Sequence, residues 1–212
     1  MTTTFVDKVK GFLLSPAESF KASRADSPGS AYRYYVMLLI IFSVLYAVVT
    51  TAIGAAAFTS MLDQLAAGGI FGAALAEVLR NFTGFIIALD LFFAYLLFLV
   101  MLFGIFLSGF MYHAFVLLFG GEKGVVTTVK TVMYANTPFL ILGWIPYIGV
   151  IGAIWSFVLL VIGIKETQER TLGNAFLIVI IPLLLVFLLV LFGAVLIAVL
   201  LESLLHIIPF MG

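Results

Sequence analysis

The stretch that decides the fold runs from Tyr134 to Trp155 and reads YANTPFLILGWIPYIGVIGAIW. It is apolar enough for a lipid bilayer, yet it contains a polar Tyr-Ala-Asn-Thr run, two prolines and three glycines. Proline removes a backbone hydrogen bond from a helix, and Trp and Tyr prefer the membrane–water interface. The stretch therefore predicts two membrane spans, with Pro138 inside the first and Pro146 at the tight turn between them.

The composition of the whole chain favours the bilayer as its solvent. Of 212 residues, 65% are hydrophobic and only 9% are charged, which is too little charge to cover a soluble domain. Ten basic residues balance ten acidic ones, so the net charge indicates no nucleic-acid partner. The absence of cysteine excludes disulfides, thiolate metal sites and a cysteine nucleophile.

Apolar runs of about twenty residues predict five spans. The second run is long, but it has no proline or polar turn near Gly104, so we expect one continuous helix there. Residues 59–80 are expected to form a loop with a short amphipathic helix. The predicted spans are Tyr32 to Phe58, Phe82 to Phe119, Val125 to Ile145, Tyr147 to Ile164, and Asn174 to Leu200.

The basic residues predict the orientation of these spans. With five spans, nine of the ten basic residues lie on one side, and only Arg80 lies on the other. Because cytoplasmic loops carry an excess of Lys and Arg, this asymmetry predicts a cytoplasmic N-terminus and a C-terminus outside. The expected fold class is an all-α integral membrane protein. It comprises residues 1–31 as cytoplasmic helices, 32–200 as the membrane domain and 201–212 as an amphipathic tail.

Two short amphipathic helices are predicted within the first thirty residues. Thr4 is positioned to cap the first helix, and Ser15, Pro16 and Glu18 have the spacing of a capping box for the second. Their apolar faces suit either the lipid headgroup layer or a lid packed on the cytoplasmic end of the protein itself. We expect this segment to be retained, since it lacks the apolar core of a signal peptide.

Small and polar residues mark the third and fourth spans. Pro138 leaves the carbonyl of Tyr134 without its helical partner, within reach of the side chains of Asn136 or Thr137. On the fourth span, small residues share one face and permit close approach of a neighbouring helix. These predicted packing residues are Gly149, Gly152, Ala153 and Ser156.

Ionisable residues inside spans are candidate functional sites. Asp90 is alone on an apolar helix, and it is either functional or an interfacial carboxylate bonded to a neighbouring span or to Arg80. His113 is either a structural residue near a helix C-terminus or a proton relay. Lys130 can extend to the interface, pair with Glu122 or attract an anionic lipid headgroup, which makes such a lipid a candidate partner.

Four polar residues of the second and third spans are candidates for one site. His113, Lys130, Tyr134 and Asn136 converge if the two helices are adjacent, and Pro138 then supplies a kinked wall, as in ion and substrate sites. The alternative is a buried polar contact that fixes helix packing. No catalytic or metal-binding motif is present, so we expect no enzyme activity, no metal and no cofactor.

Four stretches between about Leu13 and Leu200 have the form of family motifs. They are LLSPAESFKAS, HAFVLLFGGEKGVVTTVKTVMYANTP, GWIPYIGVIGAIWSFVLLVIGIKE and NAFLIVIIP. These stretches resemble motifs of the Yip domain family, multi-span membrane proteins named for binding Ypt/Rab GTPases. The resemblance implies five spans, a cytoplasmic N-terminus and contacts with related membrane proteins.

The resemblance also bears on function and location. Eukaryotic members act in Golgi and endoplasmic-reticulum trafficking, whereas a prokaryotic member, which this short chain resembles, would lie in the plasma membrane. The short N-terminal region speaks against binding of a small GTPase. We therefore expect a non-enzymatic scaffold or adaptor that packs with itself or with other membrane proteins. The alternative is a small transporter or ion channel with a polar site at the kinked third span.

Overall fold

The chain forms an all-helical membrane domain, as the apolar runs predict. The computed structural model describes residues 4–207, with side chains through Ser203, and this part contains nine α-helices and no strand. Five helices, counting α6 and α7 as one interrupted span, are long and apolar enough to cross a membrane. The helices are α1 (Phe5–Leu14), α2 (Pro16–Ser23), α3 (Pro28–Ala66), α4 (Ile70–Arg80), α5 (Thr83–Leu118), α6 (Val125–Ala135), α7 (Thr137–Leu142), α8 (Gly149–Thr167) and α9 (Leu172–Ile207).

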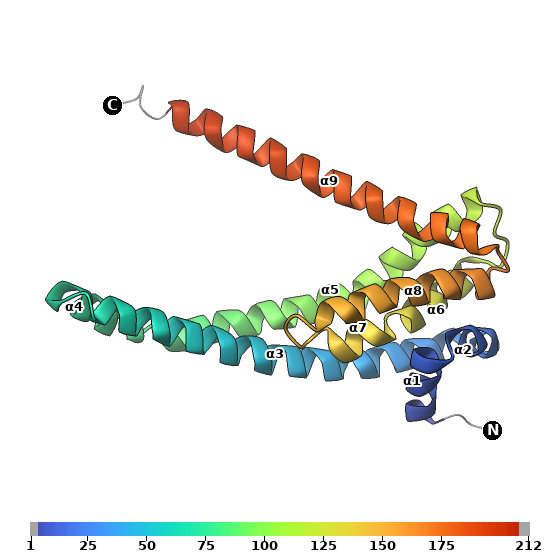
Figure 1. Ribbon diagram of the computed structural model, residues 1–212, viewed down its shortest axis with the longest axis horizontal. Helices are drawn as coiled ribbons and strands as arrows, with labels where there is room; N and C mark the ends of the chain where they lie inside the picture. Colours follow the sequence, from blue (N-terminus) through green and yellow to red (C-terminus); the bar gives the residue numbers. More distant parts are fainter. Residues whose placement is uncertain (1–3, 208–212) are drawn as a thin grey trace.

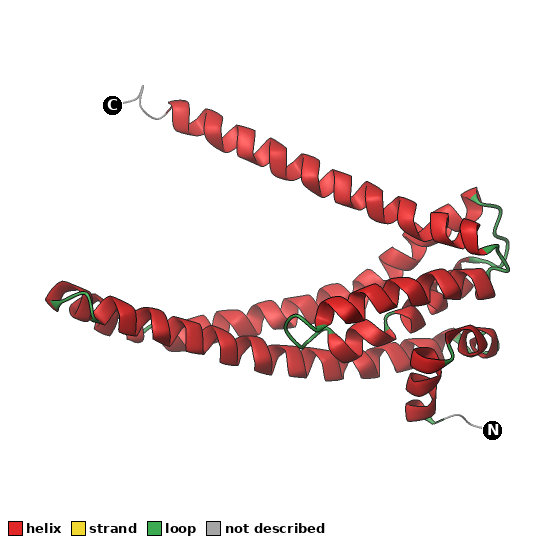
Figure 2. Cartoon of the chain, in the orientation of Figure 1, coloured by secondary structure: helices red, strands yellow, loops and turns green. Residues whose placement is uncertain are grey.

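The fold is built around two long antiparallel helices, α3 and α5 (Figure 1). They are joined at one end by α4, and α6, α7 and α8 pack beside their other half. At that other end α1 and α2 fold back on the bundle, and α9 begins there and then diverges from it. Figure 2 shows that short loops join the helices.

The second span is one unbroken helix, as predicted, and α4 is the short helix expected within residues 59–80, but the loop expected before it was predicted wrongly. α5 has 36 residues, whereas residues 59–66 continue α3 instead of forming a loop. Residues 59–66, which read TSMLDQLA, include the helix formers Met, Leu, Gln and Ala and contain no proline. The turn to α4 comes only at Gly69, whose φ of +102° suits glycine.

The helical hairpins differ greatly in length. α3 has 39 residues and α8 has 19, which correspond to about 58 Å and about 28 Å at 1.5 Å per residue. The ring of Phe139 in α7 lies 5.5 Å from that of Phe42, near the middle of α3. The α3–α4–α5 hairpin therefore extends well past the turn between α7 and α8 (Figure 1).

The first two helices form a lid on the protein's own end, which was one of the two expected arrangements. We call α1 and α2 the N-terminal lid. Phe12 and Phe20 are 1% and 0% exposed, and the ring of Phe12 stacks on Tyr134 at 4.6 Å. These two phenylalanines of the lid are thus buried in protein, whereas Val6 and Leu14 remain exposed.

The caps of the lid helices follow the prediction only in part. Thr4 forms the predicted cap, as a capping box with Asp7. Ser15 lies at the start of α2, but its side chain makes no capping hydrogen bond, so the predicted box with Glu18 is wrong. Ser15 also ends α1, and its N–H donates to the carbonyl of Gly11. One residue that serves two helix ends cannot adopt the backbone conformation of a free N-cap.

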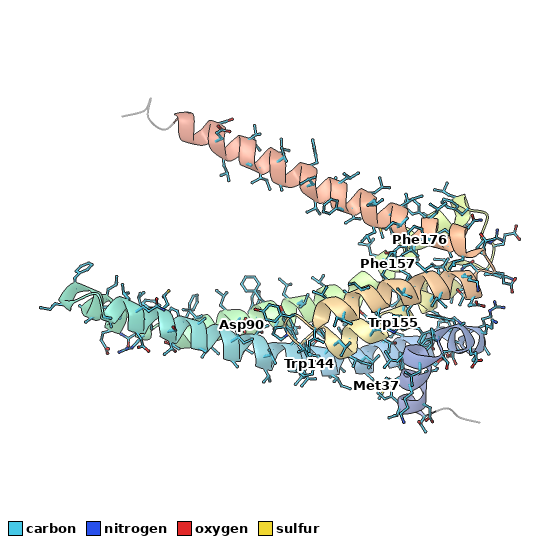
Figure 3. All side chains as sticks on the ribbon, in the orientation of Figure 1. Met37, Asp90, Trp144, Trp155, Phe157 and Phe176 are labelled. Carbon is cyan, nitrogen blue, oxygen red and sulfur yellow. The ribbon has the colours of Figure 1, made fainter. Side chains whose placement is uncertain are left out.

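The last helix packs on the bundle only near its beginning. Ala175, Ile178 and Val179 are buried, and the ring of Phe176 meets that of Phe157 edge-on at 6.1 Å (Figure 3). From Leu183 to Leu201 the large apolar side chains of α9 are exposed. α9 continues into the predicted tail as far as Ile207, and the remaining residues, 208–212, lie outside the described part of the chain.

Candidate functional site at the break in the third span

The third span is broken at Asn136, between α6 and α7, where the sequence predicts a bend. The hydroxyl of Thr137 donates to the carbonyl of Tyr134 at 2.6 Å, and the Asn136 amide donates to the carbonyl of Val132 at 2.8 Å. The carbonyl freed by Pro138 is thus satisfied by one of the two predicted side chains. Because the Thr137 proton is used there, the hydroxyl of Tyr34 donates to the Thr137 oxygen across 3.0 Å.

α8 supports the break through a hydroxyl. The N–H of Phe139, one of the free donors at the start of α7, donates to the hydroxyl oxygen of Ser156 at 3.0 Å. The sequence interpretation placed Ser156 on the packing face only because of its small size. Its hydroxyl in fact accepts a hydrogen bond from a backbone N–H that has no partner within α7.

The other predicted packing residues divide into two kinds. A Cβ atom at Gly152 would lie 2.9 Å from the carbonyl oxygen of Pro138, and one at Gly149 would lie 3.0 Å from that of Gly143. At these two positions α8 approaches the backbone of α7 and the following turn too closely for a side chain. Ala153, by contrast, lines a cavity.

Lys130 holds the N-terminal lid. Its ammonium group donates to the main-chain carbonyls of Ser23, Arg24 and Asp26, at 3.4, 3.2 and 2.7 Å. These carbonyls lie at and after the C-terminal end of α2, which attracts a positive charge. The predicted ion pair with Glu122 is absent from the described structure, because all three ammonium hydrogens face these carbonyls.

Tyr134 joins the third span to the same lid. Its hydroxyl donates to the Asp26 carboxylate at 2.6 Å and accepts from the Lys8 ammonium at 3.3 Å. Lys8 and Asp26 also form an ion pair at 2.8 Å. A buried aromatic ring, a carboxylate and an ammonium group from three segments thereby fix how the lid sits.

His113 belongs to a separate chain of hydrogen bonds. The buried Gln168 amide donates to the hydroxyl oxygen of Thr128 at 3.0 Å, and that hydroxyl lies 2.9 Å from Nδ1 of His113. Since a carboxamide N–H can only donate, the Thr128 proton is available to Nδ1. This arrangement favours the histidine tautomer with its proton on Nε2.

The four candidates of the second and third spans do not form one hydrogen-bonded cluster. Lys130 and Tyr134 meet through Asp26, whereas His113 bonds to Thr128 and Asn136 bonds within its own helix. Sequence reasoning missed Asp26 and Gln168. The only signal for Asp26 was its place in the helix-breaking ADSPGS segment.

Asp90 lies in the outer half of the long hairpin, away from the break. Its carboxylate accepts hydrogen bonds from Thr51 at 2.5 Å and from Thr50 at 3.4 Å, both on α3. Asp90 is therefore bonded to a neighbouring span, which was one of the expected arrangements. It is not bonded to Arg80, because Arg80 pairs with Asp63 at 3.0 Å and with Glu77 at 3.5 Å. Figure 3 shows Asp90 on the α4 side of Trp144, which marks the turn after α7.

A cavity of about 620 Å³ reaches Asn136. It lies between α5, α6, α8 and α9, next to the place where α9 leaves the bundle. Its polar lining consists of Ser108, Tyr112, Asn136 and Ser156, and the rest of its wall is apolar and includes Ala153 and Phe157. No charged side chain is among the described residues that line it.

The described residues do not meet the requirements of a metal site. Within residues 4–203, no group of three or more His, Asp or Glu side chains could hold a metal ion.

Comparison with known protein families identifies the family of this chain. The sequence model of the family described as Yip1 domain matches residues 10–195. No curated protein and no solved structure matches the chain.

Proposed function

Because this chain belongs to the Yip1 domain family, we propose that it is a membrane scaffold or adaptor, which packs with a second copy or with other membrane proteins. It is an integral membrane protein with five apolar helices long enough to span a bilayer. The proposed role is non-enzymatic, because packing of helices requires no reacting group.

The observation that carries this proposal is the free surface of α9. Its large apolar side chains from Leu183 to Leu201 are exposed, so just over half of the helix has no partner in the described chain. Ala194 and Ala198 lie four residues apart on one side of this segment. Small residues at this spacing let two helices approach closely in a bilayer, where packing drives association.

The N-terminal lid provides a second, fixed surface at the end of the bundle where α9 begins, away from the exposed part of α9. Arg24 and Lys123 both pair with Glu169, at 2.9 and 2.7 Å, which ties α2 and two loops together. The carboxylate accepts a hydrogen bond from Lys123, and this bond, with the positive charges of Lys123 and Arg24, lowers the pKa of Glu169 below its ordinary value. A lid held in this way suits an adaptor better than a mobile tail.

Cysteine cross-linking in membranes tests the scaffold proposal, because the natural chain has no cysteine. Ala194→Cys and Ala198→Cys should each form disulfide-linked dimers, or discrete cross-links to a membrane partner through a bifunctional thiol reagent. Leu196→Cys and Leu200→Cys, on the opposite side of α9, are the matched controls. Equal cross-linking at all four positions, or none at any, would contradict a specific packing face.

Transport of a small solute is the second candidate, favoured by the cavity at the broken span. Asp90 lies eighteen residues before Ser108 on α5, about 27 Å along the helix, so the two do not form one site. Purified protein in liposomes provides the test. Solute or ion flux that disappears in Asn136→Leu would support transport, and absence of flux under imposed gradients would leave the scaffold proposal standing.

A further inference from the structure

We propose that the cavity beside Asn136 binds an uncharged lipid that carries a hydroxyl and a carbonyl group, as diacylglycerol does. This inference goes beyond the scaffold role and does not depend on it.

The polar groups of the cavity provide donors and acceptors for a ligand. Asn136 uses one amide hydrogen on the carbonyl of Val132, which leaves its amide oxygen and its second hydrogen. Tyr112 and Ser108 add hydroxyls from α5. A ligand hydroxyl can donate to the amide oxygen, and a ligand carbonyl can accept from the hydroxyls.

The wall of the cavity restricts the charge of the ligand. None of the described lining residues is acidic or basic, and the remainder of the wall is aliphatic or aromatic. A phosphate or carboxylate would lose its hydration there without any counter-charge, which is very costly. An uncharged head on an apolar body suits this lining.

The depth of the polar groups excludes ordinary phospholipid headgroups as their partners. Ser108 lies ten residues before the end of α5, and Asn136 lies eleven residues after the start of α6. Both are therefore about 15 Å from the same end of the bundle, which is half of the roughly 30 Å hydrocarbon thickness. Phospholipid headgroups stay at the interface, whereas uncharged lipids can enter the bilayer centre.

The cavity has an opening toward the lipid. Leu183, which lines it, is 46% exposed and is followed by the diverging part of α9. Figure 3 shows Phe157 and Phe176 where α8 and α9 still meet, and beyond them the two helices separate. The volume of about 620 Å³ lies within the range of small-molecule pockets. A lipid can therefore enter sideways from the bilayer.

Photo-crosslinking to the full-length protein in nanodiscs tests the proposal. The probe is a diacylglycerol with a diazirine in one acyl chain. Two controls carry the same chain: the methyl ether of that diacylglycerol, which lacks the donor, and a phosphatidylcholine. We expect the diacylglycerol probe to label peptides that contain Ser108 and Ala153, with at least five-fold preference over both controls. Equal labelling by phosphatidylcholine would overturn the proposal.

Variants then test the assigned groups. Tyr112→Phe keeps the ring but removes the hydroxyl, and it should lower the affinity of the probe about five-fold, the effect of one ordinary hydrogen bond. Ala153→Phe should fill the cavity and abolish labelling. The control is Tyr95→Phe, which removes a hydroxyl from the exposed side of α5.

The two variants differ in their risk to the fold. If Ala153→Phe fails to fold, the isosteric Tyr112→Phe still decides the question, with its thermal unfolding measured beside the wild type. Labelling of Tyr112→Phe at the wild-type level would contradict the assigned role of the cavity. Cross-linking through α9 reports separately on the scaffold proposal, so failure of one is distinguishable from failure of the other.

Discussion

Replacement of Lys130 by methionine should release the N-terminal lid. Methionine keeps the length and helix propensity of the side chain, but it cannot donate to the three carbonyls after α2. Two of these bonds, at 2.7 and 3.2 Å, have ordinary lengths, whereas the third, at 3.4 Å, is weak. A hydrogen bond from a charged donor contributes about 1.5 kcal/mol or more, so two give about 3 kcal/mol. That free energy corresponds to a roughly 100-fold change in the docking equilibrium.

Hydrogen exchange measured by mass spectrometry in nanodiscs provides the assay. The amides of α1 and α2 in Lys130→Met should lose protection by about two orders of magnitude, whereas those of α8 serve as an internal reference and should change little. Lys123→Met is the matched control. Its ion pair with Glu169 is 47% exposed on the lysine side, and such surface pairs contribute at most about 1 kcal/mol.

The result for Lys130→Met bears directly on the geometry of the lid. If protection of the lid in Lys130→Met equals that in the wild type or in Lys123→Met, the three carbonyl contacts do not hold the lid. The lid would then be held by its buried phenylalanines, by the contacts among Lys8, Asp26 and Tyr134, and by the ion pairs of Glu169.

Three further predictions concern the break, the α7–α8 contact and the orientation. Thr137→Val removes the hydrogen-bond partner of both the Tyr134 carbonyl and the Tyr34 hydroxyl. It should lower the free energy of unfolding in detergent by about 2 kcal/mol. The control Thr127→Val loses one exposed hydrogen bond and should lower this free energy less. Gly152→Ala places a Cβ 2.9 Å from a backbone carbonyl oxygen and should cost about 1–3 kcal/mol, seen as a lower unfolding temperature. A cysteine at Ser60 should react with an impermeant maleimide in intact cells, whereas one at Ser15 should react only after lysis; the opposite pattern would reverse the predicted topology.

The spans were predictable because they depend on local properties of the chain. The length of the apolar runs and the absence of a breaker near Gly104 sufficed to predict α5 as one helix. Pro138 likewise sufficed to predict the break and the side-chain bond to the Tyr134 carbonyl. Both predictions depend on residues close together in the sequence.

The contacts of the lid and the cavity were not predictable in the same way. Lys130 meets carbonyls more than a hundred residues away, and no local pattern distinguishes it from a lysine that reaches an interface. The cavity lies where α9 leaves the bundle after its first turns, and apart from Pro182 the sequence is apolar on both sides of that point. Such an arrangement depends on tertiary packing, which periodicity does not report.

The unequal hairpins have a consequence for the lipid that surrounds them. A helix of about 28 Å, such as α8, matches a hydrocarbon layer of roughly 30 Å. α5, by contrast, still exposes Phe85 and Leu89, which precede Asp90 and lie beyond the α7–α8 turn (Figure 3). A flat bilayer cannot match both sides of the protein, and each ångström of mismatch costs a fraction of a kcal/mol. The leaflet on the α4 side of the protein is therefore drawn away from the bilayer centre along one flank only. A protein with this asymmetry would concentrate in thick or bent regions of the bilayer and would help to stabilise them.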